Sequence, residues 1–264
     1  MQSSPNRNIP ISEDEANRYT RLSILRSEEL YGQGFQSPGG RDSVRTFAEE
    51  LQITHDTTIL DIGSGVGGAA FYFAAQFGAS VVGLDASSDM IEISNERLAE
   101  HHLPGVSFRQ GRIEDAPLDA ETFDIAWTRD VIVCVQAKDR LWKNVYDCLK
   151  PGGRLFATDF CRNQESLGNE FSEHALHCEY YLQDLDQYVS TLEAAGFRSI
   201  VAEDLTHLLI EFLHQEQSKL EEKQEDFVRK YGATEFQFLH ERWNKKIRFC
   251  ELGDLRWGKF TARK

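Results

Sequence analysis

The 264-residue sequence lacks any apolar run near the roughly 20 residues that a membrane helix requires, so we predict no membrane-spanning segment. Residues 1–11 lack the charged and then apolar pattern of a signal peptide, and we expect them to form a disordered tail. No internal repeat or low-complexity block is present. The 41% hydrophobic content suffices for one sizeable core, and we expect residues 1–264 to form a single domain.

Cysteine is scarce, and it lacks the spacing of metal ligands. The five cysteines are odd in number and scattered, so we expect reduced thiols, a cytoplasmic location and no metal site. They are Cys134, Cys148, Cys161, Cys178 and Cys250.

Positive charge is in deficit, with 29 Lys and Arg residues against 43 Asp and Glu residues and a net charge of −14. Counterion release would oppose binding to nucleic acid or to an anionic membrane, so we predict neither partner. The acidic balance fits a small cationic substrate, although plain solubility explains it equally well. We expect a small-molecule partner, and the sequence leaves a monomer and a homodimer both open.

The most informative segment is residues 58–68, TILDIGSGVGG, which predicts an apolar strand, a tight glycine turn and the start of a helix. A second apolar run, residues 80–84, ends at Asp85. Glycines such as Gly63 and Gly65 let a ligand approach the backbone closely, and a carboxylate at the position of Asp85 can accept both ribose hydroxyls. This unit predicts an adenosine-containing cofactor.

Asp61 narrows the choice of cofactor. It stands at the end of the first strand, directly before the glycines, where a carboxylate would repel the pyrophosphate of a dinucleotide. The same carboxylate suits a ligand with positive charge, such as the amino group and sulfonium of S-adenosylmethionine. Asp61 therefore favours S-adenosylmethionine over a nicotinamide or flavin cofactor.

Strands and helices alternate from residue 58 to about residue 160, which is typical of a parallel sheet with helices on both faces. Residues 123–127 begin a fourth strand, and LKPGG at residues 149–153 ends a helix before a strand at 154–158. In this order the motifs resemble the class I S-adenosylmethionine-dependent methyltransferases. That resemblance implies an α/β, Rossmann-like fold with a seven-stranded, mostly parallel sheet and a helical cap or lid.

The flanking segments supply the expected cap and lid. Residues 12–51 would form the helical cap, with helices at 12–30 and 41–51, and residues 161–181 would form a substrate lid. We expect a helix over residues 182–195 and a strand over 199–205. The charged residues 215–231 predict a single solvated surface helix, and residues 255–261 predict a last, antiparallel strand.

Nearly the whole chain resembles the phosphoethanolamine N-methyltransferases, the single-domain protozoan type in particular. The resemblance rests on YT at residues 19–20, YGQGFQSPGG at 31–40, TRD at 128–130, TDFC at 158–161, WNKK at 243–246 and GDLRWGKF at 253–260. It implies catalytic roles for Tyr19, as part of a cap over the methyl group, and for Asp130, which would either orient a cationic substrate or only anchor its neighbourhood. We expect ten residues to bind cofactor, including those of the glycine unit. They are Gln36, Ser37, Asp61, Gly63, Gly65, Asp85, Ala86, Arg112, Ile113 and Arg129.

This chain departs from that family at several positions. Cys134 stands where the family has a histidine paired with its tyrosine, and a thiol cannot replace imidazole as a proton carrier near pH 7. Arg112 stands where an acid accepts the adenine amino group, and an arginine cannot accept a hydrogen bond. The positions that grip substrate phosphate in the family correspond here to Phe160, His174, Cys178, Tyr180 and Lys246.

The substituted substrate positions retain few donors for a phosphate, and phosphoethanolamine is therefore a doubtful substrate. Phe160, Tyr180, Tyr181 and Trp243 can instead form an aromatic wall that tolerates a methylated ammonium. We predict methyl transfer from S-adenosylmethionine to the amine of a small polar metabolite. Two alternatives stay open: an O- or S-methyltransferase of a small metabolite, and a protein that binds the cofactor without methyl transfer.

Overall fold

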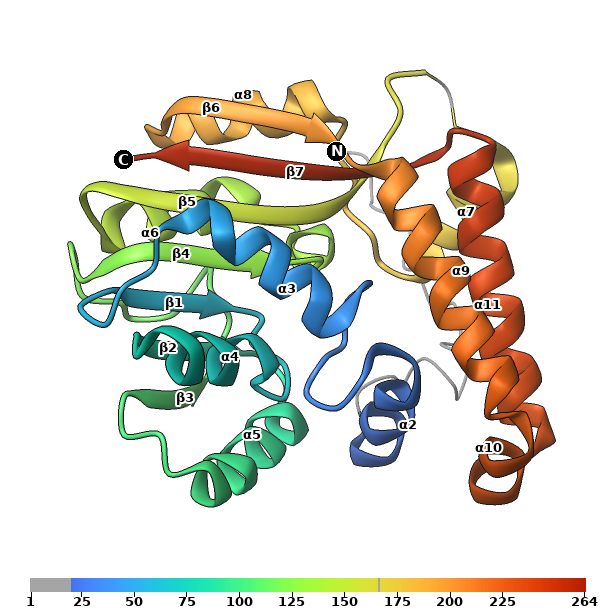
Figure 1. The fold of residues 1–264 in the computed structure, drawn as a ribbon. Helices are drawn as coiled ribbons and strands as arrows, with labels where there is room; N and C mark the ends of the chain where they lie inside the picture. Colours follow the sequence, from blue (N-terminus) through green and yellow to red (C-terminus); the bar gives the residue numbers. More distant parts are fainter. Residues whose placement is uncertain (1–19, 166) are drawn as a thin grey trace, which may run out of the picture.

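A seven-stranded sheet forms the centre of the computed structural model, which describes residues 20–264 apart from Ser166 (Figure 1). The strand order is β3-β2-β1-β4-β5-β7-β6. The strands are β1 (Thr58–Ile62), β2 (Ser80–Asp85), β3 (Val106–Gln110), β4 (Phe123–Arg129), β5 (Leu149–Arg162), β6 (Arg198–Asp204) and β7 (Leu255–Arg263).

The strand directions confirm the predicted sheet. Strands β1 to β5 pair in parallel, and β7 runs antiparallel between β5 and β6. The chain builds β1, β2 and β3 in one direction and then returns to place β4 on the other side of β1. This reversal leaves a crevice outside the carboxyl ends of β1 and β4, where open α/β sheets bind their ligands.

Helices cover both faces of the sheet because neighbouring residues of a strand point to opposite sides. Ile59, Ile125 and Phe156 pack in one core with α3 and α4, whereas Leu60 and Leu155 pack in another with α6 and α8. The helices are α2 (Arg21–Tyr31), α3 (Gly40–Ala48), α4 (Gly68–Phe77), α5 (Ser88–His101), α6 (Lys138–Cys148), α7 (Asn169–His177), α8 (Leu185–Ala195), α9 (Thr206–Glu222), α10 (Gln224–Tyr231) and α11 (Ala233–Glu251).

The prediction of one solvated helix over residues 215–231 is wrong. The chain forms two helices there, α9 and α10, which are separated at Lys223. Leu209, Leu213 and Leu220 of α9 are buried, as is Phe227 of α10. The charged residues had hidden this apolar stripe, which repeats at helical spacing and packs in the same core as α11.

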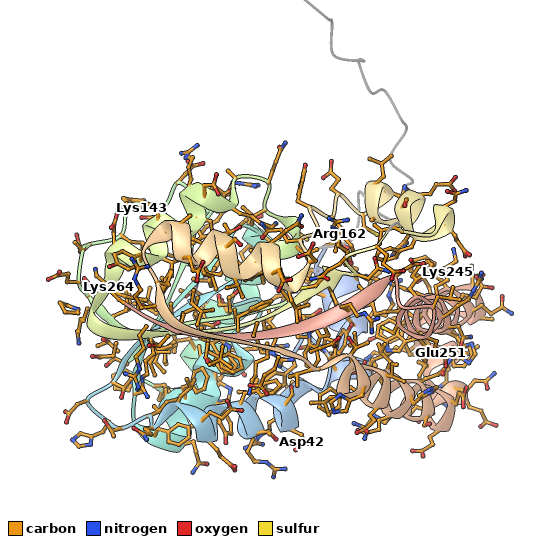
Figure 2. All side chains as sticks on the ribbon, turned by 90° about the horizontal axis from the view of Figure 1, so that it is seen from above. Asp42, Lys143, Arg162, Lys245, Glu251 and Lys264 are labelled. Atoms are coloured by element: carbon orange, nitrogen blue, oxygen red, sulfur yellow. The ribbon has the colours of Figure 1, made fainter. Side chains whose placement is uncertain are left out.

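Helices α9 and α11 lie beyond the carboxyl ends of the parallel strands, and α2 lies nearby (Figure 1). Seen from above, α9 and α11 occupy the end of the molecule marked by Lys245 and Glu251, opposite the end marked by Lys143 and Lys264 (Figure 2). The crevice between β1 and β4 therefore opens toward these helices. None of the described helices combines the length and apolar character that crossing a membrane would require.

The described part of the predicted cap begins at Thr20, whose side chain accepts a hydrogen bond from the Ser23 backbone at the start of α2. The rest of the helix predicted over residues 12–30, including Tyr19, lies outside the described residues. Glu28 holds α2 to the body of the protein. Its two carboxylate oxygens accept from Arg97 of α5 at 2.6 and 2.8 Å, and one of them also accepts from the Gly34 backbone at 2.6 Å.

We expect Arg97→Met to loosen α2, because it leaves the largely buried Glu28 carboxylate without its cation. Breaking such a pair lowers the free energy of unfolding by about 3 kcal/mol. Hydrogen exchange of the α2 amides should become at least tenfold faster. Arg21→Met is the matched control, because the pair that Arg21 forms with Glu96 is half exposed and should contribute little. Equal exchange rates in the two variants would contradict this role of Glu28.

Candidate functional site

A glycine turn connects β1 to α4 at the edge of the sheet. The backbone N–H groups of Gly63 and Ser64 donate to the carbonyl of Leu84 at 2.7 and 3.1 Å, which joins the turn to the end of β2. Gly63 has a φ of +68°, and a Cβ atom there would lie 2.2 Å from the side chain of Val131. Only glycine therefore fits at this position.

Asp85 lies beside this turn at the end of β2, as the spacing predicts. Its two carboxylate oxygens accept hydrogen bonds from the backbone N–H groups of Gly65 at 2.8 Å and Ser87 at 2.9 Å. Burial raises the pKa of Asp85 above its usual range. Each carboxylate oxygen has a second lone pair, so the group can still accept from a ligand hydroxyl.

A cavity lies between the glycine turn, the ends of β1 and β4 and the loop before α3. Six of the residues predicted to bind cofactor line it together. They are Gln36, Ser37, Asp61, Gly63, Gly65 and Arg129.

Asp61 is the buried acid of this cavity, with 3% of its surface exposed. Burial, and secondarily the nearby Asp85 carboxylate, raise the pKa of Asp61 to about 7. Its Oδ2 atom is buried and has no hydrogen-bond partner among the described residues. An unpaired buried carboxylate oxygen is costly, and a cationic ligand group would satisfy it.

Arg129 holds the loop that closes the cavity. Its buried guanidinium donates to the carbonyl of Pro38 at 2.7 Å and to Oγ of Ser43 at 2.8 Å, and it lies 5.6 Å from the ring centroid of Phe47. These contacts use a charged side chain to fix the main chain beside Gln36 and Ser37.

Four residues predicted to bind cofactor do not line the cavity: Asp85, which lies beside the glycine turn, and Ala86, Arg112 and Ile113. The Arg112 side chain is 61% exposed, and its Nε atom donates to Glu114 at 2.8 Å. The guanidinium therefore remains in water beside a carboxylate. Ile113 is buried in the core that contains Leu84. The carbonyl of Ala86 accepts from the Gln110 side chain at 3.3 Å.

Asp130 follows β4 at the border of the cavity. Its Oδ1 atom accepts from the Trp257 indole at 2.7 Å and from the Thr158 hydroxyl at 3.2 Å. Its Oδ2 atom lies 3.9 Å from Arg129 and has no hydrogen-bond partner among residues 20–264, Ser166 apart. The backbone φ of +58° is in the left-handed region, which aspartate tolerates better than most residues. Trp257 thus holds one oxygen and leaves the other for a further group.

The five predicted substrate residues come together beside α11. The rings of Phe160 and Tyr180 are stacked with centroids 6.3 Å apart, and Nζ of Lys246 lies 4.6 Å from the Phe160 centroid. His174 of α7 meets Tyr180 edge-on at 6.2 Å, and its Nε2 atom is 3.6 Å from Sγ of Cys178. Segments far apart in the sequence therefore form one mixed aromatic and polar wall.

The predicted lid and its neighbours differ in detail from expectation. Residues 161–181 begin with the end of β5 and contain α7, whose Phe171 packs on Phe249 of α11 at 5.0 Å. Trp243 lies in the wall as predicted, with Nζ of Lys246 at 5.7 Å from its ring centroid. Tyr181 is 38% exposed and lies near Lys138 instead. Cys134 is exposed, at the end of a short 3-10 helix.

Sequence reasoning missed two residues that adjoin the wall. Tyr31 packs on Trp243 with ring centroids 5.6 Å apart, and burial raises the pKa of its hydroxyl. Glu216 of α9 is 2% exposed and accepts from the Trp243 indole at 2.9 Å. The available signal was that Glu216 stands on the leucine stripe of α9, between Leu213 and Leu220.

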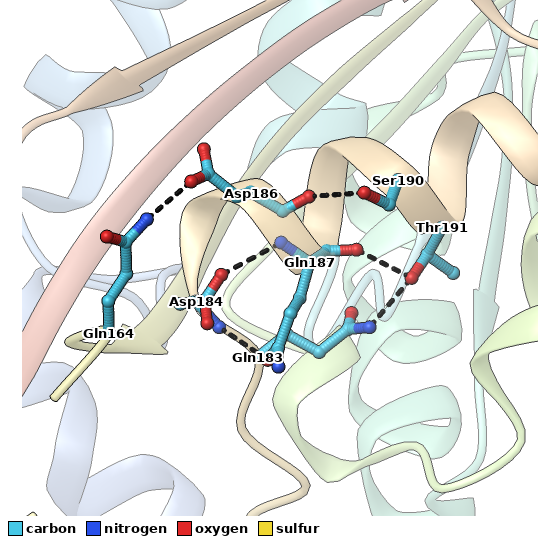
Figure 3. Close-up of a pocket in the computed structure, with 7 residues that line it drawn as sticks. All are labelled: Gln164, Gln183, Asp184, Asp186, Gln187, Ser190 and Thr191. Atoms are coloured by element: carbon cyan, nitrogen blue, oxygen red, sulfur yellow. Dashed lines mark hydrogen bonds between the residues drawn. The ribbon is translucent and has the colours of Figure 1, made fainter. Parts of the chain in front are cut away.

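A second hollow lies on the surface at the start of α8, and its lining includes no residue of the glycine turn (Figure 3). Its amides, hydroxyls and carboxylates bond mainly to one another. Asp184 caps α8 by accepting from the Gln187 backbone at 2.8 Å, and Gln183 donates to Thr191 at 2.7 Å. These contacts stabilise the helix start, so we do not assign ligand binding to this hollow.

The chain belongs to the methyltransferase domain family, whose model matches residues 53–224. Within curated proteins it is similar to phosphoethanolamine N-methyltransferases, with 32% identity over 94% of this chain to enzyme 1 of Arabidopsis thaliana and 29% over 95% to that of Plasmodium falciparum. The match covers 50% of the plant protein and 94% of the parasite protein. The chain thus spans about half the length of the plant relatives that it matches.

A solved structure agrees with this relationship. Phosphoethanolamine N-methyltransferase 2 of Haemonchus contortus, in complex with phosphomonomethylethanolamine and S-adenosylhomocysteine, superposes with a TM-score of 0.92 and 28% sequence identity. The superposition covers 95% of this chain and 59% of the nematode protein.

Proposed function

We propose that this protein transfers the methyl group of S-adenosylmethionine to the amine of a small polar metabolite. The observation that carries the proposal is the unpaired Asp61 oxygen, which is buried beside the glycine turn of a methyltransferase family member. The amino group of the cofactor would satisfy this oxygen. Asp85 would accept the ribose hydroxyls, and Gln36, Ser37 and Arg129 would complete the cavity wall.

Methyl transfer from a sulfonium is an in-line displacement. The amine lone pair attacks the methyl carbon, the carbon–sulfur bond breaks, and its electron pair returns to sulfur to leave S-adenosylhomocysteine. The amine must be deprotonated before attack, and its proton passes to water or to a nearby base. The protein has to exclude water and align the two reactants. Asp130 would orient the amine through its unpaired Oδ2 atom.

The wall beside Asp130 supports an acceptor with at most one negative charge. Lys246 contributes one ammonium, Tyr180 one phenol and His174 one imidazole, whereas Phe160 and Cys178 offer no strong donor for a phosphate dianion. Asp130 adds negative charge, which also disfavours a dianion. We therefore rank amines that carry one carboxylate above phosphoethanolamine. A curated relative from Actinopolyspora halophila, at 27% identity over 84% of this chain, is a glycine/sarcosine/dimethylglycine N-methyltransferase.

The test is an acceptor panel followed by mass spectrometry of the methylated product and of S-adenosylhomocysteine. The panel contains amines with a carboxylate, amines with a phosphate, uncharged amines, thiols and carboxylic acids. We expect methylated amine, with more product from carboxylate-bearing than from phosphate-bearing amines. Product from thiols or oxygen acceptors alone would make this an S- or O-methyltransferase. Bound cofactor that stays intact with every acceptor would contradict methyl transfer.

Asp85→Ala tests the ribose assignment. Losing hydrogen bonds to a charged group should weaken binding of S-adenosylmethionine by roughly 1–3 kcal/mol. Isothermal titration calorimetry measures the change, and Glu92→Ala, an exposed acid on α5, is the control. Unchanged affinity in Asp85→Ala would remove Asp85 from the cofactor site.

The cellular setting is part of the same proposal. Within the described residues none of the five cysteines forms a disulfide, which is typical of a reducing compartment, and we propose a cytoplasmic location. A small-molecule methyl acceptor is the only partner that the proposed reaction requires.

A further inference from the structure

Glu216 is a buried carboxylate that neither lines the cofactor cavity nor belongs to the predicted wall. It lies on the apolar stripe of α9, where an aliphatic side chain would pack at no electrostatic cost. Burial raises the pKa of Glu216 to about 7. A carboxylate is costly to bury in this position, and two hydrogen bonds compensate for part of that cost.

Each oxygen of Glu216 contacts a different part of the protein. Oε1 accepts from the backbone N–H of Gly39 at 2.8 Å, in the loop before α3. Oε2 accepts from the indole N–H of Trp243 at 2.9 Å, on α11. A single side chain therefore joins two segments that are distant in the sequence.

The Gly39 contact leads to the cofactor cavity. Gly39 is adjacent to Pro38, whose carbonyl accepts from Arg129, and it follows the cavity residues Gln36 and Ser37. A Cβ atom on Gly39 would lie 2.6 Å from the Phe212 ring of α9, so helix and loop pack without spare room. Movement of α9 at Glu216 would therefore move the loop that closes the cavity.

The Trp243 contact leads to the proposed acceptor wall. The Trp243 ring packs on Tyr31, and Nζ of Lys246 lies 5.7 Å from its centroid and 4.6 Å from that of Phe160. The hydrogen bond from the indole to Glu216 fixes the orientation of this ring. Its loss would let Trp243 tilt and would displace the groups that pack on it.

We infer that Glu216 is a positioning residue that couples the cofactor loop to the acceptor wall through Gly39 and Trp243. In-line transfer requires the two reactants at a fixed separation, and a misplacement of about 1 Å can cost roughly 100-fold in rate. Glu216 sets this separation without touching either reactant. Occupancy of the cofactor cavity is therefore transmitted to the Trp243 ring.

The coupling can be tested without knowing the acceptor. The four tryptophans are replaced by 5-fluorotryptophan, and the Trp243 signal is assigned in the fluorine NMR spectrum with Trp243→Phe. Adding S-adenosylhomocysteine should shift the Trp243 signal in the native protein. In Glu216→Gln the shift should fall by at least half, because the amide has only one accepting oxygen for the two donors.

The matched control is Glu211→Gln, an exposed acid on the same helix, which should keep the full shift. Calorimetry confirms that each variant still binds S-adenosylhomocysteine. A full shift of the Trp243 signal in Glu216→Gln would overturn the inference. So would an absent shift in native protein that binds S-adenosylhomocysteine, because a purely structural Glu216 would leave Trp243 insensitive to the cavity.

A measurement on the native protein covers the case in which Glu216→Gln does not fold. The indole N–H resonance of Trp243 should titrate near pH 7 with Glu216, whose surroundings include Lys219 of α9, Lys246 of α11 and the Tyr31 hydroxyl of α2. S-adenosylhomocysteine should move the midpoint of this titration, because it fixes the loop that donates to Glu216. An unmoved midpoint would count against coupling.

Discussion

Asp61→Asn is expected to weaken binding of S-adenosylmethionine about 100-fold, near the upper end of roughly 3 kcal/mol for a hydrogen bond to a charged group. The substitution keeps the shape of the side chain and removes the negative charge that faces the cavity. It should also stabilise the ligand-free protein at neutral pH, on the order of 1–3 kcal/mol, because a neutral amide costs less to bury than a carboxylate. Calorimetry and thermal unfolding measure the two effects.

Asp61 also makes the stability of the protein and its affinity for S-adenosylmethionine depend on pH. Burial raises the pKa of Asp61 from 3.8 to about 7, so the folded ligand-free protein holds a proton that the unfolded chain releases. The contribution of Asp61 therefore lowers the free energy of unfolding as pH rises from 3.8 to about 7. A cationic ligand requires ionised Asp61, so affinity for S-adenosylmethionine should fall as pH drops below about 7. Asp61→Asn should flatten both trends, and the exposed control Asp56→Asn should keep them. Weaker binding without greater stability would show that Asp61 has another partner.

Asp130→Asn is expected to lower kcat about 100-fold while the Kd of S-adenosylmethionine changes less than twofold, because losing charge stabilisation at a reacting group costs about 3 kcal/mol. Asparagine can still accept from Trp257 and Thr158 through Oδ1, so the local fold should persist. The loss would fall on the oxygen that would orient the amine.

The rate of Asp130→Asn is measured with the best acceptor of the panel, and the exposed control Asp139→Asn should match the native protein. Near-native kcat would mean that Asp130 only anchors the region around Arg129, through its hydrogen bonds with Trp257 and Thr158. A rise in the Kd of S-adenosylmethionine equal to the loss in kcat/KM would place Asp130 in the cofactor site.

The sheet and the glycine turn were predictable because their signals are local. The apolar runs of β1 and β2, the glycines between them and Asp85 at the end of β2 each follow from a few neighbouring residues. The crevice follows from the strand order, which places the end of β1 beside that of β4. Asp61 could be assigned to the cavity for this reason.

The contacts between distant segments were not predictable in the same way. Glu216 resembles a solvated acid in a charged stretch until α11 places Trp243 against it. Arg112 follows β3 as a cofactor residue would, but its guanidinium turns to Glu114 and water. Tyr31 joins the wall only because α2 folds over α9, which no periodicity within α2 indicates.

The most direct test of the account is calorimetric titration of the purified protein with S-adenosylmethionine and, separately, with NADH. We expect saturable binding of S-adenosylmethionine at one site, about 100-fold weaker binding in Asp61→Asn, and no binding of NADH. Binding of NADH with no heat from S-adenosylmethionine would contradict it.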